Sequence, residues 1–136
     1  MPALEGIRVF YVEDDLRNRT VVRMLTERNG GVFDYEQWGF PEIILHKLHR
    51  FHPQIILLDL NFAHQQTGYG LLQVIRQQAL FKHIPVVAVS AADAALEIPK
   101  ARACGFNGFI AKPLDINLFP KQLEAVLRGG TVRYAG

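Results

Sequence analysis

Five polar side chains each stand where a short apolar run of the chain ends. They are Glu13, Asp14, Asp59, Ser90 and Lys112. In a parallel sheet the carboxyl ends of the strands share one edge, and the sites of α/β proteins form in the crevice outside that edge. If the apolar runs are such strands, side chains from four separate segments converge on one place. Three carboxylates, a hydroxyl and an ammonium group could together bind a cation and stabilise a transferred anionic group.

The three carboxylates predict a metal site. Glu13, Asp14 and Asp59 would lie close together, and like charges repel strongly at short range unless a cation lies among them. Mg²⁺ fits this site because it takes oxygen ligands and retains several waters. We predict that Asp14 and Asp59 bind the ion directly, and that Glu13 does so directly or through water. The backbone carbonyl of Asn61, two residues past Asp59, could complete the protein ligands.

The same residues could support phosphoryl transfer. A carboxylate can act as a nucleophile and form an aspartyl phosphate, and this reaction needs little beyond alignment and charge neutralisation. Mg²⁺ would neutralise one side of the phosphoryl group, and Lys112 would supply a point charge on the other. The Ser90 hydroxyl would bind a further oxygen. The pattern therefore predicts Asp59 as a phosphoacceptor.

The elements that must position these side chains alternate between apolar runs and segments of helical period. This alternation is typical of a parallel sheet with crossover helices, and such crossovers are right-handed by strong preference. We predict an α/β fold with a five-stranded, doubly wound parallel sheet and helices on both faces. The predicted strands are 7–12, 32–38, 55–59, 86–90 and 108–111, and the predicted helices include 16–28, 41–51, 71–78 and 117–127.

Two prolines shape the predicted helix starts. Proline is tolerated in the first helical turn and costs about 3 kcal/mol in the interior. Pro99 therefore predicts that the fourth helix begins near Ile98, with 91–97 as a loop or a separate turn. Pro120 predicts that the last helix begins with Asn117 as its N-cap, which would place the proline in the first turn.

Composition indicates one soluble domain. The chain has 136 residues, 49% of them hydrophobic and 21% charged, and its net charge of +2 is too small to argue for a nucleic-acid surface. No apolar run approaches the roughly 20 residues needed to span a bilayer, and the N-terminus lacks the pattern of a secretory signal. We expect a cytoplasmic protein with one domain over 1–128 and a tail or linker stub over 129–136.

Other polar residues allow more than one interpretation. Two of the three histidines His46, His49 and His52 could share a helix face and bind a metal, but a solvated helix face is the favoured interpretation. Arg17, Arg19 and Arg23 are expected to be solvated charges of the first helix, with docking of a kinase as the alternative.

Across residues 7–127 the chain resembles the receiver domain of bacterial two-component response regulators, the CheY-like family. The matching motifs are Val12-Glu13-Asp14-Asp15, Leu57-Leu58-Asp59-Leu60, Val89-Ser90-Ala91 and Ala111-Lys112-Pro113. The resemblance implies a flavodoxin-like strand order 2-1-3-4-5. It also implies that Glu13 and Asp14 are the acidic pair, Asp59 the phosphoacceptor, Ser90 the switch hydroxyl, Lys112 the site lysine and Phe109 the aromatic switch residue.

The resemblance also implies partners. A sensor histidine kinase or a histidine phosphotransfer protein would donate the phosphoryl group, and a downstream protein or a fused output domain would read the switch. Direct contact with nucleic acid or membrane is not expected. The protein would not be an enzyme beyond self-catalysed phosphotransfer and autodephosphorylation.

Two alternatives come from other classes of protein. One is a receiver-like binding module that no longer takes phosphate, because Ala63 stands where the family usually has proline and the loop before Gly68 is longer than usual if Gly68 is the family's glycine. The other is a phosphatase of the haloacid-dehalogenase type. That class needs an aspartate two residues after the nucleophile, where this chain has Asn61, and a cap domain for which the chain has no room.

Overall fold

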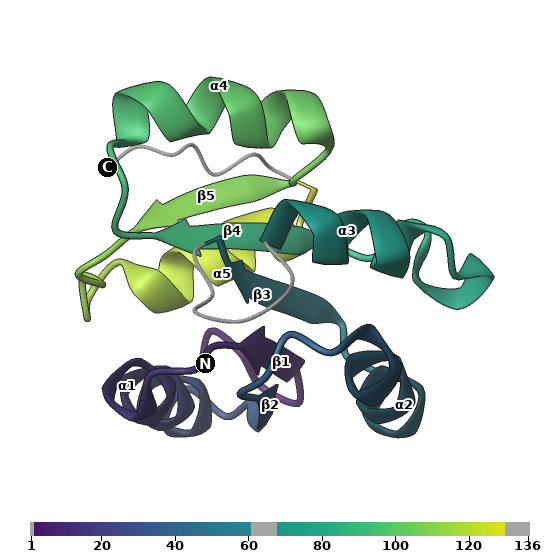
Figure 1. The fold of residues 1–136 in the computed structure, drawn as a ribbon. Helices are drawn as coiled ribbons and strands as arrows, with labels where there is room; N and C mark the ends of the chain where they lie inside the picture. Colours follow the sequence, from purple (N-terminus) through teal and green to yellow (C-terminus); the bar gives the residue numbers. More distant parts are fainter. Residues whose placement is uncertain (1, 61–67, 130–136) are drawn as a thin grey trace.

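The computed structural model describes residues 2–60 and 68–129, which form one parallel sheet between two layers of helices (Figure 1). The strands are β1 (Arg8–Val12), β2 (Val32–Glu36), β3 (Ile55–Asp59), β4 (Val86–Ser90) and β5 (Gly108–Ala111). The helices are α1 (Leu16–Arg28), α2 (Pro41–Phe51), α3 (Gly68–Arg76), the short 3₁₀ helix η1 (Ala79–Phe81), α4 (Ala94–Cys104) and α5 (Phe119–Leu127).

The strand order β2-β1-β3-β4-β5, with every neighbouring pair parallel, confirms the predicted flavodoxin-like fold. In this register Asp59 lies opposite Val89, and Ser90 lies opposite Ala111. The carboxyl ends of the strands therefore meet at one edge, as the sequence predicted.

Each face of the sheet has its own core because successive strand residues point to opposite sides. In β3, Ile55 and Leu57 pack with α1 and α5, whereas Ile56 and Leu58 pack with α2, α3 and α4. All five residues of β3 are buried, since this central strand is covered on both faces. The two layers hold the end of β3, and with it Asp59, in a fixed position.

The predicted helix α4 is wrong in its start. The helix begins at Ala94 rather than near Ile98, because the side chain of Asp93 accepts a hydrogen bond from the Ala95 N–H at 3.0 Å and caps the first turn. Pro99 consequently lies inside the helix. The proline removes the N–H that would reach the carbonyl of Ala95, and Ala95 is exposed, so water can satisfy that carbonyl.

Two other helix starts also differ from the prediction. α3 begins at Gly68 rather than at Leu71. α5 begins at Phe119, with Pro120 in its first turn as predicted, but Asn117 is not the N-cap. Instead the carboxylate of Asp115 accepts hydrogen bonds from the N–H groups of the two residues after Ile116, and so caps the turn that leads into the helix.

Candidate functional site

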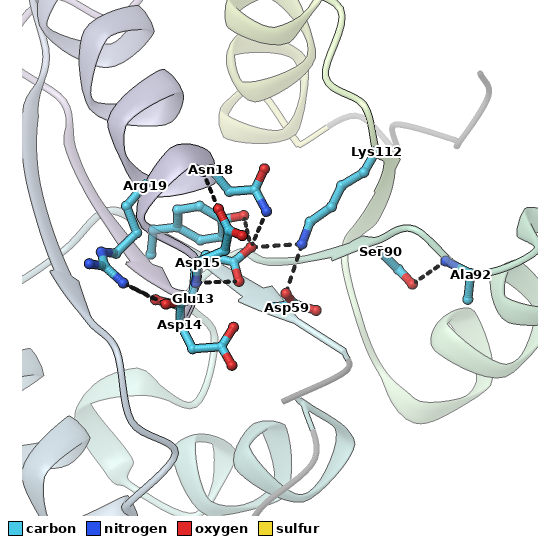
Figure 2. A network of polar contacts seen from close by, with 10 residues as sticks. Glu13, Asp14, Asp15, Asn18, Arg19, Asp59, Ser90, Ala92 and Lys112 are labelled. Carbon is cyan, nitrogen blue, oxygen red and sulfur yellow. Dashed lines mark hydrogen bonds and ion pairs between the residues drawn. The ribbon is translucent and has the colours of Figure 1, made fainter. Parts of the chain in front are cut away.

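The predicted site residues meet at the carboxyl edge of the sheet, where Lys112 joins two carboxylates (Figure 2). Its Nζ atom lies 2.7 Å from Oε1 of Glu13 and 2.8 Å from Oδ2 of Asp59. Glu13 is 0% exposed and Asp59 is 4% exposed. These three residues come from three different strand ends, so the fold brings together the charged groups that the sequence singled out.

Several donors stabilise the charged form of Glu13. Its Oε1 atom accepts hydrogen bonds from the Tyr11 hydroxyl at 2.8 Å and the Asn18 amide at 3.1 Å, and its Oε2 accepts one from the Asp15 N–H at 3.2 Å. Burial alone would raise the pKa of Glu13, but the ammonium group of Lys112 and the hydrogen bond from the Tyr11 hydroxyl outweigh it and lower that pKa. Glu13 is therefore held as a carboxylate.

The pKa of Lys112 shifts in the opposite direction. Burial would lower it, but the hydrogen bonds to Asp59 and Glu13 raise it above the ordinary value. The lysine is therefore held as an ammonium ion between the two carboxylates.

Tyr11 was not predicted as part of the site. Its ring is fully buried among the core residues beneath α1 and α5, and its hydroxyl reaches Glu13. A signal was available, because side chains two residues apart lie on the same face of a strand. Tyr11 and Glu13 have that spacing at the end of β1.

The prediction that Arg19 is a solvated charge is wrong. Arg19 is 9% exposed, and its Nη1 donates to the backbone carbonyls of Glu13 at 3.1 Å and Asp14 at 3.0 Å. Its guanidinium carbon also lies 4.7 Å from the centre of the Tyr35 ring. Arg19 precedes the buried Val22 by three residues, and this helical spacing could have placed it on the inner face of α1.

Glu13, Asp14 and Asp59 form an acidic cluster in which each residue offers one oxygen within 4.8 Å of the others. Oxygen donors at this spacing suit a hard cation such as Mg²⁺. The predicted ligand Asn61 lies outside the described residues. Within 2–60 and 68–129, the histidines of α2 and its C-cap belong to no group of three or more side chains with metal-binding spacing.

Ser90 lies at the end of β4, and Phe109 lies within β5. Ser90 is fully buried, and its Oγ accepts a hydrogen bond from the Ala92 N–H at 3.0 Å. The backbone carbonyl of Ser90 accepts from the Lys112 N–H at 2.8 Å, which links the ends of β4 and β5. Phe109 is 1% exposed and packs in the core beneath α2, α3 and α4.

Gly68 begins α3 directly against the backbone of the predicted phosphoacceptor. A β-carbon at this position would lie 2.7 Å from the carbonyl oxygen of Asp59 and 3.0 Å from the α-carbon of Leu60. Only glycine fits without a shift of that backbone. The start of α3 is therefore in close contact with the end of β3.

A flavodoxin-like sheet with an acidic cluster and a bridging lysine at its carboxyl edge defines the class of CheY-like signalling domains. The family model of the response regulator receiver domain matches residues 9–124. The chain therefore belongs to the response regulator receiver family, whose members are signalling switches of two-component systems. The resemblance seen in the sequence is confirmed.

Curated relatives support this assignment. The chain is similar to the polar-differentiation response regulator DivK of Brucella ovis, with 27% identity over 119 residues that cover 88% of this chain and 94% of the relative. It is also similar to the chemotaxis protein CheY of Pseudomonas aeruginosa, with 25% identity over 120 residues that cover 88% of this chain and 95% of the relative.

Solved structures show the same fold. The chemotaxis response regulator CheY4 of Vibrio cholerae matches with a TM-score of 0.79 and 21% identity, covering 89% of this chain and 98% of that chain. A two-component response regulator of the LuxR family from an Aurantimonas species matches with a TM-score of 0.81 and 22% identity, covering 95% of this chain and 90% of that chain.

None of the helices in the described part of the chain combines the length and the apolar character needed to cross a membrane.

Proposed function

We propose that Asp59 accepts a phosphoryl group and that this receiver thereby changes the surface it offers to a partner protein. One observation carries the proposal: a largely buried lysine joins the carboxylates of Glu13 and Asp59 at the carboxyl edge of the sheet. A carboxylate beside a fixed cation is suited to attack phosphorus, because the cation can neutralise charge on the group that arrives.

The proposed reaction is an in-line displacement at phosphorus. An oxygen of Asp59 forms a bond to phosphorus while the bond from phosphorus to the donor's imidazole nitrogen breaks. The electron pair of the broken bond stays with the donor histidine, and the product is an aspartyl phosphate.

Glu13, Asp14 and Asp59 would hold Mg²⁺, with the backbone carbonyl of Asn61 as a further proposed ligand. One oxygen from each of the three carboxylates lies within 4.8 Å of the other two, as ligands of a shared cation must. When bound, the ion would neutralise negative charge on the phosphoryl oxygens. Arg19 would keep the acidic loop in place through its two hydrogen bonds to backbone carbonyls.

Two side chains would change partners during the reaction. Lys112 would turn from the carboxylate of Asp59 toward a phosphoryl oxygen. Glu13 would keep its hydrogen bonds from Tyr11, Asn18 and the Asp15 N–H. The Ser90 hydroxyl would donate a hydrogen bond to a further phosphoryl oxygen.

Phe109 is proposed to carry the response of Ser90 to the surface near α4 and β5. The resemblance to receiver domains implies that the ring of this aromatic switch residue turns inward after phosphorylation. In the structure it already lies in the core. We therefore propose that Phe109 repacks within the core when Ser90 moves, because close-packed side chains must shift together.

We further propose the partners and the setting. The phosphodonor is a sensor histidine kinase or a histidine phosphotransfer protein in the cytoplasm, and the output is a downstream protein or a fused domain. Small phosphodonors would support self-catalysed phosphorylation, and the aspartyl phosphate would also hydrolyse. Residues 1–128 are proposed as the receiver unit and 129–136 as a tail or linker.

The test is labelling with acetyl phosphate, read by intact mass, with Mg²⁺ and with a chelator. The control variants are Asp59→Asn and Asp34→Asn, the latter at a half-buried aspartate of β2 away from the carboxyl edge. We expect one added phosphoryl group that requires Mg²⁺, persists in Asp34→Asn and vanishes in Asp59→Asn.

A second donor makes the test decisive, because some receivers are not phosphorylated by small phosphodonors. Labelling by a phosphorylated histidine phosphotransfer protein would support the proposal even if acetyl phosphate fails. If neither donor labels the protein, or if Asp59→Asn is labelled as well as the unaltered chain, the proposal is wrong. The binding-module alternative would then stand in its place.

A further inference from the structure

Tyr69 connects the start of α3 to α4 through its hydroxyl and its ring. The hydroxyl donates a hydrogen bond to Oε2 of Glu97 at 2.5 Å. The ammonium group of Lys100, one helical turn further along α4, lies 4.5 Å from the centre of the Tyr69 ring. The edge of the Phe106 ring completes the contact, with centroids 5.8 Å apart and an interplanar angle of 82°. We call Tyr69, Glu97, Lys100 and Phe106 the Tyr69 cluster.

These contacts are of types that usually stabilise the packing of two elements, here α3 and α4. A hydrogen bond to a charged acceptor is stronger than a neutral one, and a cation over an aromatic face adds attraction. Burial and the neighbouring Glu97 carboxylate raise the pKa of the Tyr69 hydroxyl, so it remains a donor at neutral pH.

The residue before Tyr69 is the glycine that touches the phosphoacceptor. Gly68 fits against the carbonyl of Asp59 only because it lacks a β-carbon, and its N–H lies 3.5 Å from the carbonyl of Leu60. Two consecutive residues thus contact the backbone of β3 on one side and α4 on the other. A shift of the backbone at Asp59 would reach α4 over this short path.

α4 is less deeply packed than the other α-helices. Ala101 is its one buried residue, and Ala94, Ile98 and Cys104 are only partly buried where they pack against the core. Pro99 removes an internal hydrogen bond midway along the helix, and Glu97 and Lys100 flank that point. The polar contacts of Tyr69 therefore matter more for the placement of α4 than they would for a deeply packed helix.

We propose that Tyr69 is a positioning residue that couples the backbone of Asp59 to α4 through Gly68 and Glu97. The coupling rests on the proposed phosphorylation of Asp59, and it uses neither Ser90 nor Phe109. The network has two defined ends, the Asp59 carbonyl and the Glu97 carboxylate. Loss of the hydroxyl would weaken the response of α4 without altering the groups that bind the phosphoryl group.

The test is a set of amide NMR spectra with and without Mg²⁺ and beryllofluoride, a stand-in for the phosphoryl group. The variants are Tyr69→Phe, which removes only the hydroxyl, and Glu97→Gln, which keeps the side-chain shape. Glu124→Gln is the matched control, because Glu124 forms an exposed pair with Arg128 on α5. We expect beryllofluoride to shift the amides of Ser90, Lys112 and α4 in the unaltered protein and in Glu124→Gln.

In Tyr69→Phe and Glu97→Gln, the shifts within 94–104 should fall about twofold or more, while those of Ser90 and Lys112 persist. A purely structural role would not separate these two sets of amides. Full α4 shifts in both variants would overturn the coupling and leave the phosphoacceptor role intact. Absence of shifts at Ser90 and Lys112 in the unaltered protein would overturn both proposals.

Discussion

The acidic site and helix α4 differ in how firmly the fold holds them. Glu13 and Asp59 are buried and Lys112 is half-buried at strand ends, and hydrogen bonds from several elements fix them. α4 has one buried residue, an internal proline and a polar connection through Tyr69. A switch needs both kinds of region, since the chemistry requires fixed groups and the output requires an element with two arrangements of similar free energy.

Lys112→Met is expected to destabilise the acidic site more than any other variant considered. The variant leaves the Glu13 and Asp59 carboxylates buried without their shared cation, so we expect a loss of about 3 kcal/mol in the free energy of unfolding without metal. Urea unfolding in a chelator measures it. The control Arg128→Met removes an exposed pair with Glu124 and should cost less than about 1 kcal/mol. Equal losses for the two variants would show that the Lys112 bridge is not a stabilising feature.

Arg19→Met tests whether the acidic loop depends on α1. Two backbone carbonyls lose their hydrogen bonds, so we expect a loss of about 2 kcal/mol in the free energy of unfolding. Weaker Mg²⁺ binding by calorimetry should accompany it, because Asp14 would be less ordered. Arg17→Met is the control, since Arg17 is exposed on the same helix. Equal destabilisation by Arg17→Met and Arg19→Met would show that the hydrogen bonds of Arg19 do not stabilise the acidic loop.

Tyr11→Phe tests a single hydrogen bond of the site. Removal of the hydroxyl takes one donor from a buried carboxylate, and we expect a loss of about 1.5 kcal/mol in the free energy of unfolding. Thermal and urea unfolding both measure this loss. Tyr35→Phe serves as the control, because the Tyr35 ring rather than its hydroxyl contacts Arg19 and Lys47. An unchanged stability of Tyr11→Phe would mean that Glu13 does not need this donor.

Pro99→Ala tests how far the internal proline weakens helix α4. The substitution restores an N–H that can reach the carbonyl of Ala95. Because water can satisfy that exposed carbonyl, we expect a gain of about 1 kcal/mol in the local stability of α4, less than the roughly 3 kcal/mol typical of an interior proline. Hydrogen exchange of the amides in 94–104 should slow, while exchange in β1 and β3 should stay the same. Faster exchange in α4 would contradict the view that Pro99 weakens the helix.

The sequence predicted the sheet and the site better than the helix starts. The apolar runs of β3, β4 and β5 have the predicted bounds, because buried parallel strands leave a continuous apolar pattern. The joint position of Glu13, Asp59 and Lys112 follows from the strand ends alone. These features depend on local pattern and on the common edge of a parallel sheet.

The missed features depend on contacts between distant segments or on competing local effects. The helix begins after the Asp93 cap and continues through Pro99, and single-residue propensity does not predict this. The roles of Tyr69 and Arg19 require knowledge of which side chains face them, Glu97 in one case and the carbonyls of the acidic loop in the other. Tertiary packing sets these contacts, and periodicity gives only their faces.

Hydrogen exchange of the phosphorylated protein directly tests whether phosphorylation of Asp59 changes helix α4. The protein would be treated with acetyl phosphate and Mg²⁺, or with a phosphorylated histidine phosphotransfer protein, beside Asp59→Asn under the same conditions. We predict that exchange changes in 94–104, stays the same in β1 and β3, and is unaltered throughout in Asp59→Asn. Unchanged exchange in α4 of the phosphorylated protein, or the same change in Asp59→Asn, would contradict an Asp59-driven switch that acts on α4.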